Sequence, residues 1–189
     1  MRIVGGSRKG KKLISPNSSI IRPTSERIRE SVFDMLVHRD YGGQSITGSK
    51  VMDLFAGTGA LGLEALSRGA DQLISVELEH SAVHCIKKNI ELLNFTDRAK
   101  VIRADACNLR VAKNKESACS FVFVDPPYGK NLACSAINQI FQGGWLTSKA
   151  VAVVETGAKD EFSQPKGFTT IDRRVYGGTQ IIFLQVSQL

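Results

Sequence analysis

The sequence predicts an α/β protein with a mostly parallel, twisted sheet, helices on both of its faces and an antiparallel hairpin at the carboxyl end. From Val51 onward, short apolar runs alternate with longer amphipathic segments, the pattern of buried parallel strands connected by helices. Near the carboxyl end, Gly177-Gly178 separates two strand-like segments, as in a β-hairpin. For 189 residues we expect a single domain, 1–189.

The first 39 residues are expected to form a short basic extension and a helix, with the core at 40–189. The stretch Met1–Ser15 contains glycines at 5, 6 and 10 and predicts a short hairpin, followed by a loop. A helix then begins with Thr24 or Ser25 as its N-cap, and Gly42-Gly43 ends its pattern. Its predicted apolar face consists of Ile28, Val32, Met35 and Leu36.

The core elements follow in order, each bounded by the end of its periodic pattern. The first core helix is expected to stop at Gly69, a favourable C-cap residue. The predicted strands are Val51–Phe55, Leu73–Glu77, Val101–Ala104, Phe121–Asp125, Val151–Glu155, Thr169–Tyr176 and Thr179–Val186. The predicted helices are Ala60–Arg68, Glu79–Leu93 and Leu132–Phe141.

Positive charge is concentrated near the amino terminus. Of a formal net charge of +7, most comes from residues 1–39, which hold nine Lys and Arg against three Asp and Glu. A localised basic surface is typical of proteins that bind polyanions, and a solvated basic arm is the alternative. No apolar run is long enough to cross a bilayer, and no apolar signal segment follows the basic start. We therefore expect a cytoplasmic protein.

The cysteines and histidines predict no metal site. His80 and His84 have i, i+4 spacing but no third ligand nearby, which favours a solvated helix face. The absence of any C-x-x-C pair favours reduced thiols in a cytosolic protein over a zinc site or disulfides. The cysteines are Cys85, Cys107, Cys119 and Cys134.

A glycine-rich segment, Asp53–Gly59, lies at the first strand–helix junction. Its glycines allow the backbone to approach a ligand, and the following helix points its amino terminus at that ligand. Gly57, Gly59 and Gly62 also match G-x-G-x-x-G, so a NAD-dependent oxidoreductase is an alternative. Asp53 favours a different ligand, because an acid repels a pyrophosphate but suits a cationic sulfonium amino acid with a free ammonium group.

Acids follow the first four strands. Glu77 ends the second strand, where a carboxylate can accept both ribose hydroxyl hydrogens, and Asp105 after the third could accept from an adenine amino group. Asp53 and Asp125 complete the set. Because the carboxyl ends of parallel strands form the ligand crevice at the topological switch point, we expect all four acids to project toward it.

The segment Asp125-Pro126-Pro127-Tyr128 follows a strand that reads as fully buried. The prolines fix φ and have no N–H, so their carbonyls are held in place without ladder partners. A carboxylate, a fixed carbonyl and an aromatic face together form a clamp for a flat group bearing an NH₂. An amine methyltransferase acting on a nucleobase needs such a clamp.

Over nearly its full length the chain resembles the class I S-adenosylmethionine-dependent methyltransferases, which have a Rossmann-like fold. In particular it resembles the bacterial 16S ribosomal RNA guanine-N2 methyltransferases of the RsmD family. The segments that carry the resemblance are Met1-Arg2-Ile3 with the basic stretch to Lys12, Arg22-Pro23-Thr24 with Arg27–Phe33, Asp53–Gly59, Asp125–Tyr128 and Tyr176-Gly177-Gly178-Thr179.

The resemblance implies a role for each candidate residue. S-adenosylmethionine would be the cofactor, with its ribose at Glu77 and its adenine at Asp105. Asp125 and the Pro126 carbonyl would accept hydrogen bonds from the guanine NH₂, and Tyr128 would stack on the base. The methionine part would be held by Asp53, Gly57 and Gly59. Arg22 and Thr24 would help to form the cofactor or substrate pocket. RNA backbone would contact Arg2, Arg8, Lys9, Lys11 and Lys12.

The expected activity is methylation of the exocyclic N2 amine of a guanine in 16S ribosomal RNA, within a small subunit or an assembly intermediate, by a monomer. A DNA adenine-N6 methyltransferase needs the same clamp, but the chain has no room for a target-recognition domain. A protein glutamine methyltransferase typically has Asn in place of Asp125. The clamp alone fits the exocyclic amines of guanine, adenine and cytosine, and guanine is implied by the resemblance.

Overall fold

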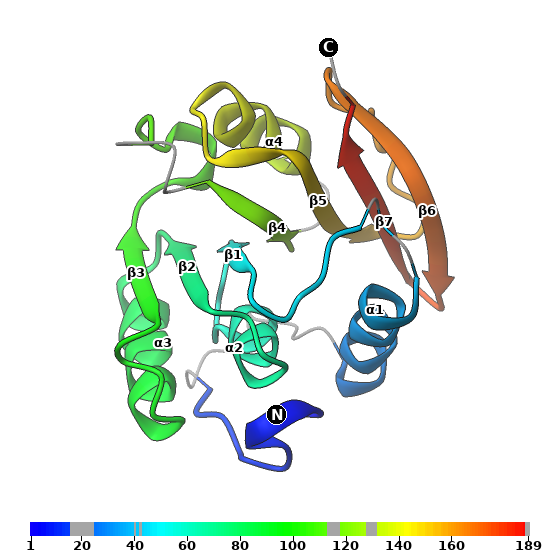
Figure 1. The fold of residues 1–189 in the computed structure, drawn as a ribbon. Coiled ribbons are helices and arrows are strands. Elements are labelled where there is room, and N and C mark those ends of the chain that lie inside the picture. Colours follow the sequence, from blue (N-terminus) through cyan, green and yellow to red (C-terminus); the bar gives the residue numbers. More distant parts are fainter. Residues whose placement is uncertain (16–24, 40, 42, 113–117, 128–131, 188–189) are drawn as a thin grey trace.

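The computed structural model describes residues 1–15, 25–39, 41, 43–112, 118–127 and 132–187. Its centre is a seven-stranded sheet in the order β3-β2-β1-β4-β5-β7-β6, in which β1 to β5 are parallel and the β6–β7 hairpin is antiparallel (Figure 1). The predicted fold class is confirmed. The strands are β1 (Lys50–Leu54), β2 (Gln72–Glu77), β3 (Ala99–Arg103), β4 (Cys119–Val124), β5 (Leu146–Gly157), β6 (Phe168–Tyr176) and β7 (Thr179–Val186).

Helices cover both faces of the sheet (Figure 1). Three of them, α1 (Glu26–His38), α2 (Ala60–Ser67) and α3 (His80–Leu92), pack on one face, and α4 (Leu132–Gln142) packs on the other. Two short 3-10 helices, η1 (Gly6–Arg8) and η2 (Ala106–Asn108), lie in connections. Among the described residues, no helix is both long and apolar enough to cross a membrane.

Alternation along the strands divides the core between the two faces. Phe121 and Phe123 of β4 pack toward α1, α2 and α3, whereas Val122 and Val124 pack toward α4. The rings of Phe33 and Phe123 lie 5.3 Å apart, which joins α1 to the centre of the sheet. Both faces of β4 are therefore buried, as its unbroken apolar run predicts.

Helix α1 begins where predicted, and its buried face contains Val32 and Leu36 of the predicted set. Ser25 is the N-cap, and its hydroxyl accepts the Ile28 N–H. The buried side chains include Phe33 and Arg29, whereas Ile28 and Met35 are only partly buried. The predicted face is therefore correct in part, and it omitted Phe33 and Arg29. An acidic partner within the core, described below, stabilises Arg29 there.

The amino-terminal hairpin, residues 1–14, is confirmed and is docked on the core. The Ile3 N–H donates to the Lys11 carbonyl at 2.9 Å and the Gly10 N–H to the Ile3 carbonyl at 2.8 Å. Ile3 and Leu13 are buried in the same cluster as α1 and α2. The basic residues therefore stand on an ordered hairpin.

Several strand limits differ from prediction by one or two residues, and β5 differs most. β1 ends at Leu54 because Phe55 has a φ of 57°, which turns the chain out of the sheet. β5 begins at Leu146 and runs for 12 residues, because its first part pairs with Cys119 ahead of a register shift in the β4–β5 pairing. That first part contains polar residues, so it does not read as an apolar strand in the sequence.

The chain order places a topological switch point between β1 and β4. From β1 the chain runs outward through β2 to β3, and then returns to β4 on the other side of β1. Connections diverge at this point, which leaves a crevice beyond the carboxyl ends of β1 and β4. The glycine-rich segment follows β1 and the Asp-Pro-Pro segment follows β4, so both lie at this crevice.

Candidate active site

The glycine-rich segment forms a tight loop between β1 and α2. The Gly59 N–H donates to the Ala56 carbonyl at 2.7 Å, and the Ala56 N–H donates to the Val76 carbonyl of β2 at 3.2 Å. Gly57 and Gly59 have φ values of 55° and 78°, which side chains other than glycine rarely adopt. The loop therefore presents backbone rather than side chains beside the amino terminus of α2.

Asp53, in β1, holds the helix that follows this loop against the sheet. Its Oδ2 accepts the Gly62 N–H of α2 at 2.9 Å, and only 2% of its surface is exposed. A methyl group on Gly62 would lie 2.5 Å from Leu73 Cδ1, so glycine allows α2 to pack closely on the sheet. Burial raises the pKa of Asp53 to about 7; the Gly62 N–H opposes this rise and the charge of Glu77 adds to it.

Glu77 joins the end of β2 to the glycine loop. Its Oε2 accepts the Gly57 N–H at 2.8 Å, while its Oε1 accepts the Leu78 and Glu79 N–H groups at 2.8 and 2.9 Å. These bonds fix the carboxylate at the carboxyl end of β2, next to β1. Oε1 already accepts two N–H groups, whereas Oε2 accepts one and has a second lone pair with which it can accept a ligand hydroxyl.

Asp105 lies two residues beyond the end of β3. Its Oδ1 accepts the Cys107 N–H at 2.8 Å and caps η2, and its side chain is exposed. The Ala104 N–H donates to the Glu77 carbonyl at 3.1 Å, which holds this turn against the end of β2. Asp105 therefore lies on the same edge of the sheet as Glu77.

The Asp-Pro-Pro segment lies beside the glycine loop. Leu54 of β1 is aligned with Val124 of β4, so Asp125 follows directly at the crevice. Asp125 is half-buried and Pro126 is buried, whereas Pro127 is exposed. Tyr128, Arg22 and Thr24 lie outside the described residues.

The structure brings Gly57, Gly59, Glu77, Asp105 and Asp125 to one edge of the sheet. Asp53 differs from the expectation that all four acids project into the crevice, because it lies one residue inside β1 with its carboxylate bonded to the first turn of α2.

Sequence analysis assigned no role to two polar residues at the end of β5. Glu155 and Thr156 are 7% and 8% exposed and lie in the strand next to β4. The signal was present in the sequence, since Glu155 follows an apolar run just as Asp125 does.

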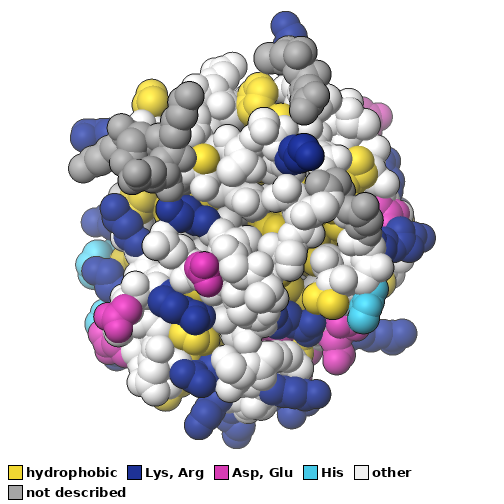
Figure 2. Space-filling view, viewed as in Figure 1, with side chains coloured by type: hydrophobic (Ala, Val, Ile, Leu, Met, Phe, Trp, Pro, Cys, Tyr) yellow, Lys and Arg dark blue, Asp and Glu magenta, His cyan; other side chains and the backbone are white. Residues whose placement is uncertain are grey.

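The basic candidates differ in their surroundings. Lys and Arg side chains gather at the lower end of the face in Figure 2, where Figure 1 places the amino-terminal hairpin. Lys9, Lys11 and Lys12 are exposed. Arg2 pairs with Glu26 at 3.0 Å, and Arg8 donates to the Leu93 carbonyl and lies over the Phe95 ring. The three lysines are the freest of the five to meet a polyanion.

Known proteins resemble this chain over most of its length. The ribosomal RNA small subunit methyltransferase D of Haemophilus influenzae is 33% identical over 178 residues, 94% of this chain and 89% of that protein. The protein of the same name from Escherichia coli K12 is 36% identical over 156 residues, 82% of this chain and 74% of that protein.

Solved structures share the fold. The Escherichia coli structure of yhhF has a TM-score of 0.85 at 30% identity and covers 100% of this chain and 99% of its own. An RNA methyltransferase from Salinibacter ruber in complex with S-adenosyl-L-homocysteine has a TM-score of 0.64 at 13% identity, covering 88% of this chain and 95% of its own, and shows the fold alone.

Fold and site together define the class: the molecule has the Rossmann-like fold of the S-adenosylmethionine-dependent methyltransferases. A family model described as "Conserved hypothetical protein 95" matches residues 1–185. The chain belongs to this family, the RsmD family that the motifs of the sequence indicated. The residues present fit its cofactor, because the half-buried Gly57 has no side chain to keep a ligand from the loop, and three acids lie at the adjoining strand ends.

Proposed function

We propose that this chain transfers a methyl group from S-adenosylmethionine to the exocyclic N2 amine of a guanine in 16S ribosomal RNA. The observation that carries the proposal is the placement of Asp125 and Pro126 at the carboxyl end of β4, directly beside the glycine loop that follows β1. The relatives named ribosomal RNA small subunit methyltransferase D support the choice of RNA.

Cofactor binding is assigned to the edge formed by β1, β2 and β3. The backbone at Gly57 and Gly59 contacts the methionine part, and the nearby Asp53 favours its ammonium group. Glu77 accepts the ribose hydroxyls and Asp105 accepts the adenine amine. Arg22 and Thr24 are assigned to help form the cofactor or substrate pocket. When bound, S-adenosylmethionine supplies a methyl group on a cationic sulfur.

On the substrate side, Asp125 and the Pro126 carbonyl accept the two N–H groups of the guanine amine. The lone pair of that nitrogen is delocalised into the ring, which makes it a weak nucleophile. Two acceptors favour a more pyramidal nitrogen and aim its lone pair at the methyl group. Positioning of this kind is worth up to about 7–11 kcal/mol in ideal cases. Asp125 need not be a strong base, because the nitrogen becomes acidic only as the new bond forms.

Tyr128 is assigned to stacking on the target base, an interaction worth about 1–3 kcal/mol per base. The base must be unpaired or flipped out of a helix to reach the clamp. The basic hairpin, with Arg2, Arg8, Lys9, Lys11 and Lys12, contacts RNA phosphates, which position the substrate without specifying its sequence. In this division of roles, residues 1–39 serve the RNA and the cofactor pocket and residues 40–189 form the catalytic core.

The substrate is proposed to be a small ribosomal subunit or an assembly intermediate, met by a monomer in the cytoplasm. The test is transfer of radiolabelled methyl from S-adenosylmethionine to small subunits from cells lacking this protein, followed by nucleoside analysis. Label in N2-methylguanosine is the expected result. Label in N6-methyladenosine, or label only when duplex DNA is supplied, would replace the proposal with an adenine methyltransferase.

A further inference from the structure

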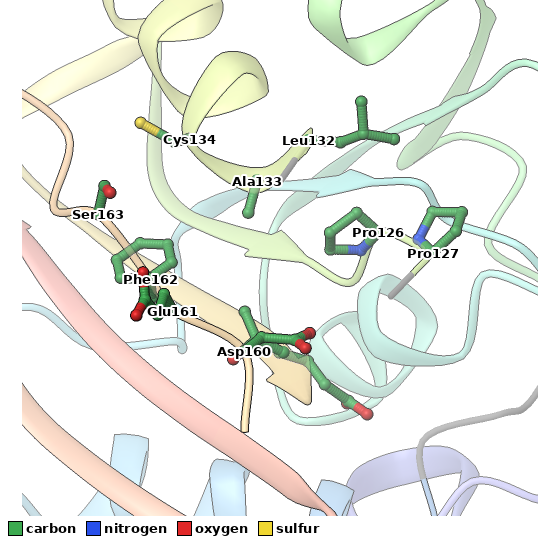
Figure 3. A pocket seen from close by; sticks show the side chains of 11 residues that line it. Pro126, Pro127, Leu132, Ala133, Cys134, Asp160, Glu161, Phe162 and Ser163 are labelled. Atoms are coloured by element: carbon green, nitrogen blue, oxygen red, sulfur yellow. The ribbon is translucent and has the colours of Figure 1, made fainter. Parts of the chain in front are cut away.

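A pocket of about 260 Å³ lies on the β5 side of the Asp-Pro-Pro segment (Figure 3). Pro126 and Pro127 form one end of it, and Phe162 lies at the other. Ala133, near the start of α4, lines it as well. The volume is just under the range of about 300–1,000 Å³ that holds drug-sized ligands, so a single base fits it.

Carboxylates give this pocket its chemical character. Asp160 and Glu161 line it from the loop after β5, and Glu155 lines it from the end of that strand. Asp160 already accepts the Gly157 N–H at 3.0 Å and thereby shapes the loop, and Glu161 is exposed. Glu155 differs from both, because it is 7% exposed and lies within β5, which is paired on both sides.

The sheet register places Glu155 next to the clamp. Val124 of β4 is aligned with Val154 of β5, and the two strands are parallel. The next residues in the chain are Asp125, directly after β4, and Glu155, within β5, so the register places these two acids side by side at the carboxyl end of β4. Adjacent parallel strands lie about 4.8 Å apart. Two side chains that start from neighbouring strands can therefore reach the same edge of one base.

We propose that Glu155 selects guanine over other bases by accepting its N1–H, while Asp125 and Pro126 accept the adjacent 2-amino group. The inference rests on the proposed function. It adds a means of distinguishing guanine from adenine and cytosine, whose exocyclic amines also fit the clamp. In guanine, N1–H and the 2-amino group are neighbouring donors. The oxygens of a carboxylate accept hydrogen bonds, so such a group complements this edge.

The same carboxylate opposes the other amine-bearing bases. Next to its 6-amino group adenine has a lone pair at N1, and next to its 4-amino group cytosine has a lone pair at N3. A buried carboxylate facing such a lone pair has no hydrogen to accept and repels it. Sites built to hydrogen-bond a substrate reject analogues that lack the matching group more strongly than apolar pockets do. Glu155 thereby supplies specificity by exclusion.

The test compares guanine with 2-aminopurine, which keeps the 2-amino group but has a lone pair at N1. Each base is placed by splinted ligation at the nucleotide mapped as methylated, in 16S RNA assembled with small-subunit proteins. Wild-type protein is expected to methylate guanine about 10–100-fold faster, as kcat/KM, than 2-aminopurine. Glu155→Gln offers an amide N–H to the N1 lone pair, so it is expected to reverse or erase that preference.

Glu161→Gln is the matched control, because it removes the same charge from the exposed rim of the same pocket. It should keep the wild-type preference. An unchanged preference in Glu155→Gln, or an equal shift in Glu161→Gln, would overturn the assignment. If Glu155→Gln fails to fold, the wild-type protein alone still tests the proposal. Equal rates of methylation of guanine and 2-aminopurine would exclude recognition of the guanine N1–H. Absence of any methylation of guanine by wild type would instead refute the proposed function.

Discussion

The side chains of Arg29 and Glu64 meet in the core with no exposed surface, and Nε of the one lies 3.6 Å from Oε2 of the other. Arg29 also donates to the Arg2 carbonyl, while Glu64 accepts the Val4 N–H at 2.8 Å and Arg68 Nε at 2.9 Å. Burial lowers the pKa of Arg29, and the charge of Glu64 opposes that shift. The pair joins α1, α2 and the amino-terminal hairpin.

Removing one member of this pair should destabilise the protein strongly. Arg29→Met removes one of the two arginines that pair with the buried Glu64 and leaves the pair with Arg68, so it should cost up to about 3–5 kcal/mol, the scale of a broken buried ion pair. Adding Glu64→Gln removes the Glu64 charge but keeps an acceptor for Val4, so the double variant should be more stable than Arg29→Met alone. Chemical denaturation measures the free energy of unfolding of the two single variants and of the double variant. A double variant whose loss equals the sum of the two single losses would refute the coupling.

Docking of the amino-terminal hairpin depends on Gly6. Its φ is 73°, and a methyl group there would lie 1.9 Å from the Ser67 carbonyl oxygen. Gly10 has a φ of 84° but nothing within 4 Å of the same position, so Gly10→Ala is the matched control for backbone strain. We expect Gly6→Ala to expose the hairpin to hydrogen exchange while Gly10→Ala does not. Equal exchange in the two variants would contradict the docking contact.

Asp53 should make stability depend on pH. Its pKa is raised to about 7 in the folded chain from an ordinary value of 3.8, so the folded state holds a proton that the unfolded state releases. Stability from this group is therefore present near pH 4 and is lost as pH rises to about 7. The loss is at most about 4 kcal/mol. Relative to wild type, Asp53→Asn should gain stability across this window and stay level above it.

A cationic ligand near Asp53 should reverse this preference for the proton. Binding of S-adenosylmethionine favours the ionised carboxylate, so affinity should rise as pH rises through about 7 and binding should release a proton. Calorimetry near pH 6.5 in two buffers with different ionisation enthalpies measures that proton. Asp53→Asn should bind more weakly and without this buffer dependence. The same proton release from Asp53→Asn would assign it to another group.

The exposed lysines of the hairpin should set the salt dependence of RNA binding. Each phosphate contact contributes about −0.7 to −0.9 to the slope of log K against log salt. Lys11→Gln with Lys12→Gln should flatten the slope by up to two such contacts and leave cofactor affinity unchanged. Lys149→Gln with Lys166→Gln makes the same charge change at exposed positions outside the hairpin. A similar flattening in both double variants would argue against a localised RNA surface.

Much of the fold could be predicted because its parallel strands are buried on both faces and therefore read as apolar runs. Val151–Val154 is such a run, and the segment before it was missed because polar residues occupy that end of β5. The buried Arg29 could not be predicted, since its stability depends on a carboxylate 35 positions away in the chain.

The site was predicted in outline because its acids follow apolar strands, a pattern that the parallel sheet converts into neighbours. The sequence could not indicate that the Asp53 carboxylate accepts the Gly62 N–H of α2, because that bond depends on the close approach of Gly62 to β2. Nor could it indicate that Glu155 stands beside Asp125, because the pairing of β4 with β5 is a property of the sheet order.

The central claim is that Asp125 aligns a guanine amine for methyl transfer. The most direct measurement is the single-turnover rate of N2-methylguanosine formation in small ribosomal subunits, with S-adenosylmethionine and subunits saturating, for wild type and Asp125→Ala. Saturation separates alignment from binding. We predict a loss of roughly 100-fold or more in the variant, the scale seen when one preorganised hydrogen-bonding group is removed. A variant that forms N2-methylguanosine at the wild-type rate would contradict the account.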